Sequence, residues 1–207
     1  MPAPAPSSQP TPSTRPSSAT PGSTDAPVGH PPVVADGPGW HAGAIDGPVP
    51  APGSCHYAVV ESLSLPDRSC TPGAIDPAVT QANLSQTLCR SGGYTASVRP
   101  PQAVTDAFKK VARASYSAPG ASSDYELDHL VPLGLGGAST ARNLWPERNS
   151  GDPHDFDRRS SGGANAKDGV ESRLNRAVCS GEVSLVAAQN AVATNWYTAE
   201  TVLGVTP

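Results

Sequence analysis

One stretch, YELDHLVPLGLGGASTARNLWPE at residues 125–147, constrains the fold of this chain more than any other. It predicts a short apolar strand over residues 125–131, a glycine-rich turn opened by Pro132, and a second short apolar segment over residues 143–145. Together these segments form a β-hairpin. A helical pattern follows further along the chain, so the region has the order strand, turn, strand, loop, helix.

Three side chains in the hairpin suggest a chemical site. Asp128 and His129 adjoin near the end of the first strand, and Asn143 lies at the start of the second. Imidazole titrates near neutral pH, so His129 is suited to take a proton from water. A carboxylate beside it is suited to hold a metal ion, although successive side chains of a strand point to opposite faces and both reach one place only at a strand end or bulge.

The composition divides the chain into a tether and one domain. Residues 1–53 consist largely of Pro, Ala, Ser, Thr and Gly, and we expect a disordered tether there, because such a segment buries too little apolar surface to offset the entropy of ordering. Residues 54–207 are expected to form a single disulfide-stabilised α+β domain, with a hairpin–helix core over about residues 125–179.

Hydrophobic periodicity predicts the other elements of this domain. Strands are expected at residues 56–60 and 94–98, and helices from residue 76 to 88, 103–113, 166–178 and 184–196. The loop at 148–163 is long for a compact domain, and we expect it to be disordered with some phosphate contact from its arginines.

The charge balance excludes one class of protein. The formal net charge is −4 and the pI is about 5.7, which argues against a broadly basic protein that coats nucleic acid. Cationic and acidic residues balance from Arg90 onward, so an enzyme that touches few phosphates remains compatible with the composition.

Four dispersed cysteines bear on the compartment. Their spacing lacks the close pairs typical of zinc sites, and an even number fits disulfides in an oxidising compartment. Of the three possible pairings we favour Cys55–Cys70 and Cys89–Cys179; four buried reduced thiols are the alternative. We therefore expect an extracellular or cell-envelope protein, although no signal peptide is visible at the given start and no stretch is apolar enough to span a membrane.

Several segments of the chain resemble the HNH-type endonucleases of the ββα-metal group, in particular an exported bacterial subset. The segments that carry the resemblance are ELDHLVPLGLGG (126–137), RNLWPE (142–147) and AKDGVESRLNRAVCSG (166–181), with LPD (65–67), TPGA (71–74), DPAVT (76–80) and VRPP (98–101) upstream. The resemblance covers about residues 65–197 and leaves the tether outside it.

The resemblance implies roles for the hairpin residues. It makes His129 the general base, Asp128 a metal ligand, and Asn143 the amide that tethers the hairpin and orients the base. The cofactor would be a divalent metal, Mg²⁺ or Mn²⁺, because oxygen ligands suit these hard cations.

The third position of the motif departs from the family pattern. Many members have a His at the start of the helix, whereas this chain has Asn165, which is equally compatible with a helix N-cap. Asp168 or His154 are alternative ligands.

Two cations are candidates for phosphate contact. Lys167 would contact the scissile or a neighbouring phosphate. Arg142 would either bind phosphate or pair with Glu126 across the hairpin.

These expectations define a function. We expect a metal-dependent endonuclease acting on nucleic acid, DNA in preference to RNA, as a monomer without a membrane span. The alternative is a non-catalytic exported or envelope-associated binding module on the same scaffold. A toxin-like effector would share the chemistry of the first.

Overall fold

The computed structural model describes residues 1–2, 29–60, 63–149 and 165–206, which form short paired strands and a set of helices. The strands are β1 (Val33–Val34), β2 (Trp40–His41), β3 (Ala44–Ile45), β4 (Ala58–Val60), β5 (Leu63–Leu65), β6 (Ala74–Ile75), β7 (Tyr125–His129) and β8 (Leu144–Arg148). The helices are α1 (Tyr94–Val98), α2 (Gln102–Ser115), α3 (Ala166–Ser180), α4 (Leu185–Asn195) and α5 (Ala199–Leu203), with 3-10 turns η1 (Gln81–Asn83), η2 (Ser122–Asp124) and η3 (Leu133–Leu135).

The strands pair two by two, so each sheet in the described residues has two strands. β1 pairs with β6 in parallel, and the pairs β2–β3, β4–β5 and β7–β8 are antiparallel. The mixture of helices and small sheets agrees with the expected α and β composition of the domain. The HNH-type core itself stays a prediction.

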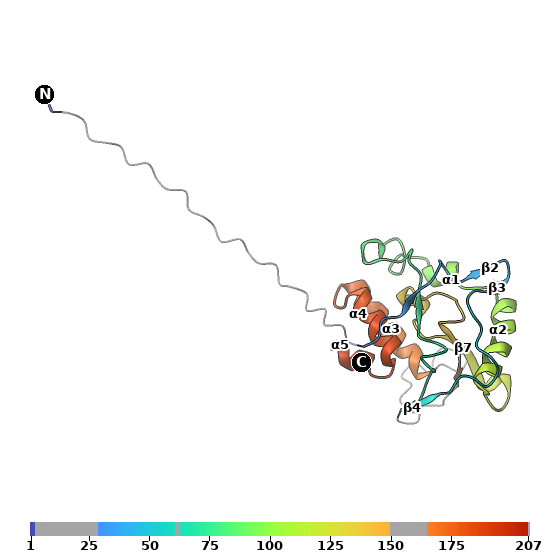
Figure 1. The fold of residues 1–207 in the computed structure, drawn as a ribbon. Helices are drawn as coiled ribbons and strands as arrows, with labels where there is room; N and C mark the ends of the chain where they lie inside the picture. The colour runs from blue at the N-terminus through green and yellow to red at the C-terminus, as the bar shows by residue number, and fades with distance from the viewer. Residues whose placement is uncertain (3–28, 61–62, 150–164, 207) are drawn as a thin grey trace.

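The β7–β8 hairpin lies between two groups of helices. Figure 1 shows α2 on one side and the group α3, α4 and α5 on the other. Leu127 and Leu144 pack with Phe108 of α2 in one small cluster, whereas Trp145 belongs to the main core. Leu174 of α3 lies in that same main core. The hairpin is therefore packed on both faces, which a two-stranded sheet needs for stability.

The long helices agree with their predicted positions because their ends carry clear signals. α3 begins after its N-cap Asn165 and ends at Gly181, whose φ of 80° favours glycine. Ser184 caps α4 by accepting a hydrogen bond from the Ala187 N–H at 3.2 Å. The helix predicted for residues 103–113 is α2.

Two predictions of secondary structure are wrong. Residues 76–88 form turns around η1, not a helix, because side chains take the local hydrogen bonds: Asp76 accepts from the Ala78 N–H and Asn83 from the Thr80 N–H. The expected strand at 94–98 is α1. A loosely alternating run of five residues does not distinguish the two states, and the helix begins directly after Gly93.

The boundary of the tether at residue 53 is also wrong, since residues 29–53 pack on the domain. The Trp40 Nε1–H donates to the Val98 carbonyl at 3.2 Å, the Ser139 N–H to the Pro38 carbonyl at 2.7 Å, and Ser115 Oγ to the Pro50 carbonyl at 2.8 Å. Proline keeps its carbonyl acceptor, so an extended Pro-rich segment still bonds to a neighbour. Residues 3–28 and the loop at 150–164 lie outside the described residues.

Both predicted disulfides are present. Cys55 is bonded to Cys70 and Cys89 to Cys179, with Cα–Cα separations of 6.0 and 5.5 Å. The second bond joins the segment before α1 to the end of α3. Two disulfides fit an oxidising, extracellular environment. Among the helices of the described ranges, none combines the length and the apolar character needed to cross a bilayer.

Candidate active site

His129 ends β7 and is buried, with 6% of its surface exposed. Its Nε2 lies 2.9 Å from Ser139 Oγ, which is itself buried. Burial and the charges of Arg99 and Lys167 lower the pKa of His129 to about 3. The imidazole is therefore neutral at neutral pH and holds an unprotonated nitrogen.

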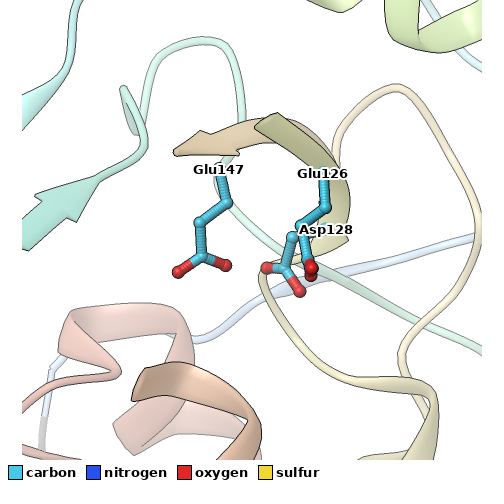
Figure 2. Close-up of side chains that lie close together, drawn as sticks. All are labelled: Glu126, Asp128 and Glu147. Carbon is cyan, nitrogen blue, oxygen red and sulfur yellow. The ribbon is translucent and has the colours of Figure 1, made fainter. Parts of the chain in front are cut away.

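Three carboxylates converge on one face of the hairpin. Glu126 and Asp128 are two residues apart on β7 and so share a face, and Glu147 of β8 lies opposite Glu126. Ligand oxygens of the three lie within 4.8 Å of one another, and Figure 2 shows their carboxylates gathered on the same side of the strands. We call these three residues the acidic group.

Burial raises the pKa of two members of the acidic group. Burial and the charges of Asp128 and Asp168 raise the pKa of Glu126 to about 7. Burial and the charge of Asp128 raise that of Glu147 well above its ordinary value. Glu147 is 4% exposed, and its Oε2 has no hydrogen-bond partner among the described residues. Such an oxygen is costly to bury unless a cation or a proton reaches it.

Asp128 is held from two sides. Its Oδ2 accepts a hydrogen bond from Trp145 Nε1–H at 2.8 Å and lies 2.9 Å from Lys167 Nζ. Trp145 is the residue opposite Asp128 in the hairpin, so the sheet register itself supplies this bond. Asp128 is therefore fixed at the edge of the acidic group.

Lys167 is buried, with 1% of its surface exposed. This position differs from the phosphate contact that was expected of its side chain. Its ammonium donates to the His129 carbonyl at 2.8 Å and pairs with Asp128 and Glu171. Burial acts to lower the pKa of Lys167, but the charges of Asp128, Glu171 and Glu147 outweigh it and raise the pKa. Lys167 lies in the first turn of α3, and its side chain links this helix to Asp128 and His129 of β7.

Asn143 is buried and forms the tether expected of it. Its Oδ1 accepts from the N–H groups of Ala74 and Val131, and its Nδ2 donates to the carbonyls of Val131 and Ala138 at 2.9 Å. These bonds close the turn that follows His129. A catalytic contribution of Asn143 stays a prediction.

Asn165, the predicted third ligand, lies at the start of α3 and takes part in capping that helix. Asn165 is the N-cap of α3, and its backbone N–H donates to Asp168 Oδ2 at 3.0 Å in a capping box. Glu126 and Glu147 lie beside Asp128 in the acidic group, and a role of Asn165 as a metal ligand stays a prediction. His154 lies outside the described residues.

Arg142 is exposed and lines a cavity of about 170 Å³ with Val33, Asp36 and Thr140, away from the acidic group. The pairing with Glu126 that we considered is absent from the described residues, because the register sets Glu126 against Glu147. The cavity of Arg142 is not the cavity that His129 lines.

A larger polar cavity, of about 530 Å³, collects the site residues. Glu126, Asp128 and His129 form one wall, and Asp168 and Glu171 of α3 form a second. The third wall is the segment at 90–99 around α1, with Arg90, Tyr94 and Arg99. Lys167 and Asn165, both described, do not line it.

Sequence reasoning missed Glu126, Glu147, Ser139 and Arg99. For the two glutamates a signal exists: the i, i+2 spacing of Glu126 and Asp128 places them on one face, and the register of the hairpin brings Glu147 opposite. Ser139 and Arg99 approach His129 from a turn and from another element, for which a single sequence holds no signal.

Comparison with protein-family models, with curated proteins and with solved structures found no match.

Proposed function

We propose that this protein is a metal-dependent endonuclease of the HNH type, which hydrolyses phosphodiester bonds of nucleic acid with His129 as general base. One observation carries the proposal: a neutral buried imidazole lines the same polar cavity as Glu126 and Asp128, and Glu147 completes their acidic group from behind the cavity wall. The resemblance of the hairpin and helix sequences to that family supports the choice of reaction.

The residues present fit a divalent cation. Two oxygens bound to one Mg²⁺ at about 2.1 Å each are at most about 4.2 Å apart, and the ligand oxygens of the acidic group lie within 4.8 Å of one another, so a small movement brings them to one ion. Glu147 Oε2 is buried and lacks a hydrogen-bond partner in the described part of the chain, as an oxygen that faces a cation would. Glu126, Asp128 and Glu147 would hold the ion. Bound Mg²⁺ or Mn²⁺ would neutralise charge on the phosphoryl group.

His129 would take the proton of the attacking water. This requires the tautomer in which Nε2–H donates to Ser139 Oγ, so that Nδ1 holds the lone pair. The lowered pKa keeps the imidazole unprotonated at neutral pH. Because the charge of a substrate phosphate raises the pKa of a nearby imidazole, proton transfer to His129 becomes more favourable once the substrate is bound.

Lys167 and Asn143 would act through the backbone of the hairpin. Lys167 Nζ bonds the carbonyl of His129, and Asn143 bonds both polar groups of the Val131 backbone. The two side chains thereby fix the strand end on either side of the base. They position His129 and do not touch the substrate.

Cleavage of circular DNA tests the proposal. Circular single-stranded DNA and supercoiled plasmid are incubated with the protein in Mg²⁺, Mn²⁺ or EDTA. We expect metal-dependent conversion to linear or nicked products, and a rate about 10²–10⁴-fold lower for His129→Ala, the range that general-base catalysis contributes. Arg142→Ala, an exposed arginine of the other cavity, is the matched control. Equal cleavage by the wild type and His129→Ala would remove His129 from the mechanism.

One observation favours the non-catalytic alternative, a binding module on the same scaffold. The ammonium of Lys167 already neutralises Asp128, as a metal ion would in an enzyme. Titration calorimetry with Mn²⁺ distinguishes the two. Binding that is lost in Glu147→Gln supports the enzyme, whereas the absence of heat in both proteins supports the binding module.

A further inference from the structure

The wall of the cavity formed by residues 90–99 carries charge of the opposite sign to the other walls. Arg90 and Arg99 are exposed cations that line the cavity, facing the carboxylates of β7 and α3. Arg90 lies over the ring of Tyr94, with its guanidinium carbon 5.5 Å from the ring centroid, and donates to Ser97 Oγ. The Arg90 guanidinium thus already interacts with two residues of the same segment, Tyr94 and Ser97.

Arg99 differs, because no ion pair forms with it among the described residues. Arg99 and His129 line the same cavity. An unpaired cation near a recessed base is placed to meet an anion that approaches the base.

The backbone of Arg99 is fixed although its side chain is exposed. Its N–H donates to the Thr95 carbonyl at 3.0 Å, and two prolines follow it. The preceding carbonyl, that of Val98, accepts the Trp40 indole bond. Cys89 anchors the start of the segment to α3. Because the backbone is already fixed, binding a ligand would require only the Arg99 side chain to be ordered.

The recessed position of the site limits the shape of the substrate. His129 and Asp128 are 6% and 7% exposed and are reached through a cavity of about 530 Å³. A rigid duplex presents its phosphates on a broad convex surface and usually meets a basic face, whereas this chain carries a net charge of −4. A flexible, unpaired strand can bring one phosphate into the cavity.

We propose that the site binds unpaired, single-stranded nucleic acid and that Arg99 is the residue that holds its phosphate beside His129. This inference rests on the proposed function. It moves phosphate recognition from Lys167 and Arg142, where the sequence suggested it, to the segment of α1.

Equilibrium binding measures the role of Arg99 separately from cleavage. A fluorescein-labelled oligonucleotide of about 12 nucleotides, a length typical of single-strand sites, is titrated by anisotropy with the His129→Ala protein in Mg²⁺. The same strand annealed to its complement is the duplex probe. Arg99→Ala, Arg99→Lys and Arg142→Ala are each added to the His129→Ala background, and circular dichroism confirms that each variant is folded.

We expect the single strand to bind more tightly than the duplex. Arg99→Ala should raise Kd for the single strand about tenfold and reduce the slope of log K against log salt by about 0.7, the value for one phosphate contact on a single strand. Arg99→Lys should restore most of the affinity, because it keeps the charge. Arg142→Ala should leave Kd unchanged.

Three results would overturn the inference: an unchanged Kd and salt slope in Arg99→Ala, tighter binding of the duplex, or no measurable binding by the His129→Ala parent. The wild type and a single Arg99→Ala variant that keeps His129 are assayed for cleavage in parallel. Cleavage that is indifferent to Arg99 refutes this inference and leaves the proposed function in place. Arg99-dependent binding without any cleavage refutes the proposed function alone.

Discussion

At the scale of single residues, the ammonium of Lys167 connects the buried charges of the candidate site, because it bonds the His129 carbonyl and pairs with Asp128 and Glu171. The places of Asp128 and His129 in a hairpin follow from local sequence pattern, whereas the direction of the Lys167 side chain does not. A lysine in the first turn of a helix is ordinarily solvated, and only the packing of α3 against β7 turns its ammonium inward.

Replacing Lys167 tests whether its ammonium is structural. Lys167→Met leaves the buried Asp128 and the partly buried Glu171 without their cation, and we expect it to lower the free energy of unfolding by about 3–5 kcal/mol, the usual effect of breaking a buried ion pair. Urea denaturation measures this. Lys110→Met, at an exposed position of α2, is the control and should change stability by less than about 0.5 kcal/mol. A Lys167→Met protein as stable as the control would contradict the assignment.

The raised pKa values predict how stability depends on pH without metal. Glu126 and Glu171, whose pKa values are raised to about 7, bind more protons in the folded protein than in the unfolded chain. Their contribution to stability is therefore lost as pH rises through 7. Between pH 6.5 and 8.5 in EDTA we expect the free energy of unfolding to fall by about 1 kcal/mol.

The free energy of unfolding is measured by urea denaturation at each pH, and two comparisons serve as controls. The free energy of unfolding of Glu126→Gln should fall less than that of the wild type, since this variant has lost one of the titrating groups. Added Mg²⁺ should also reduce the fall, because a cation binds the ionised carboxylates. Stability that rises over the same interval would show that the glutamates are not held protonated by the fold.

At the scale of elements, length decides what the sequence can predict. The long helices α2, α3 and α4 and the β7–β8 hairpin have repeated patterns and end signals, and they were predicted. The short α1 and η1 were not, because five residues fit more than one state and side-chain hydrogen bonds decide between them.

The two disulfides should contribute unequally. Cys89–Cys179 closes 90 residues and Cys55–Cys70 closes 15, so chain entropy predicts that removing the first costs about 4–5 kcal/mol and removing the second about 3 kcal/mol. Paired Cys→Ala variants, compared by thermal and urea unfolding, measure the difference. The Cys89–Cys179 variant should also bind the single strand more weakly, because that bond anchors the wall with Arg99. Equal losses in both variants would show that loop length does not govern their stability.

At the scale of the whole molecule, the sequence underestimates the folded part. Composition marks residues 1–53 as one segment, but backbone carbonyls and Trp40 tie residues 29–53 to α1, α2 and the turn before β8. Composition reports how much apolar surface a segment has, and it says nothing of hydrogen bonds that a segment makes to a neighbour already folded.

Truncation tests this boundary. A chain that starts at residue 54 loses the bonds of β1, Trp40 and Pro50, and we expect it to be less stable by about 3–6 kcal/mol, at about 1 kcal/mol for each hydrogen bond. A chain that starts at residue 29 keeps all of these bonds and is the control. Thermal melts of both chains give the measurement, and identical melting temperatures would restore the boundary at 53.

The charges on the β7–β8 hairpin have a consequence for how the chain reaches its fold. A slip of one residue in the strand pairing would turn every side chain of β7 to the opposite face. Glu126 and Asp128 would then meet Phe108 in the apolar cluster, and Asp128 would lose its ion pair with Lys167. Burying two unpaired carboxylates among apolar side chains is costly. The acidic group thus rejects misaligned hairpins during folding, before any ligand is bound.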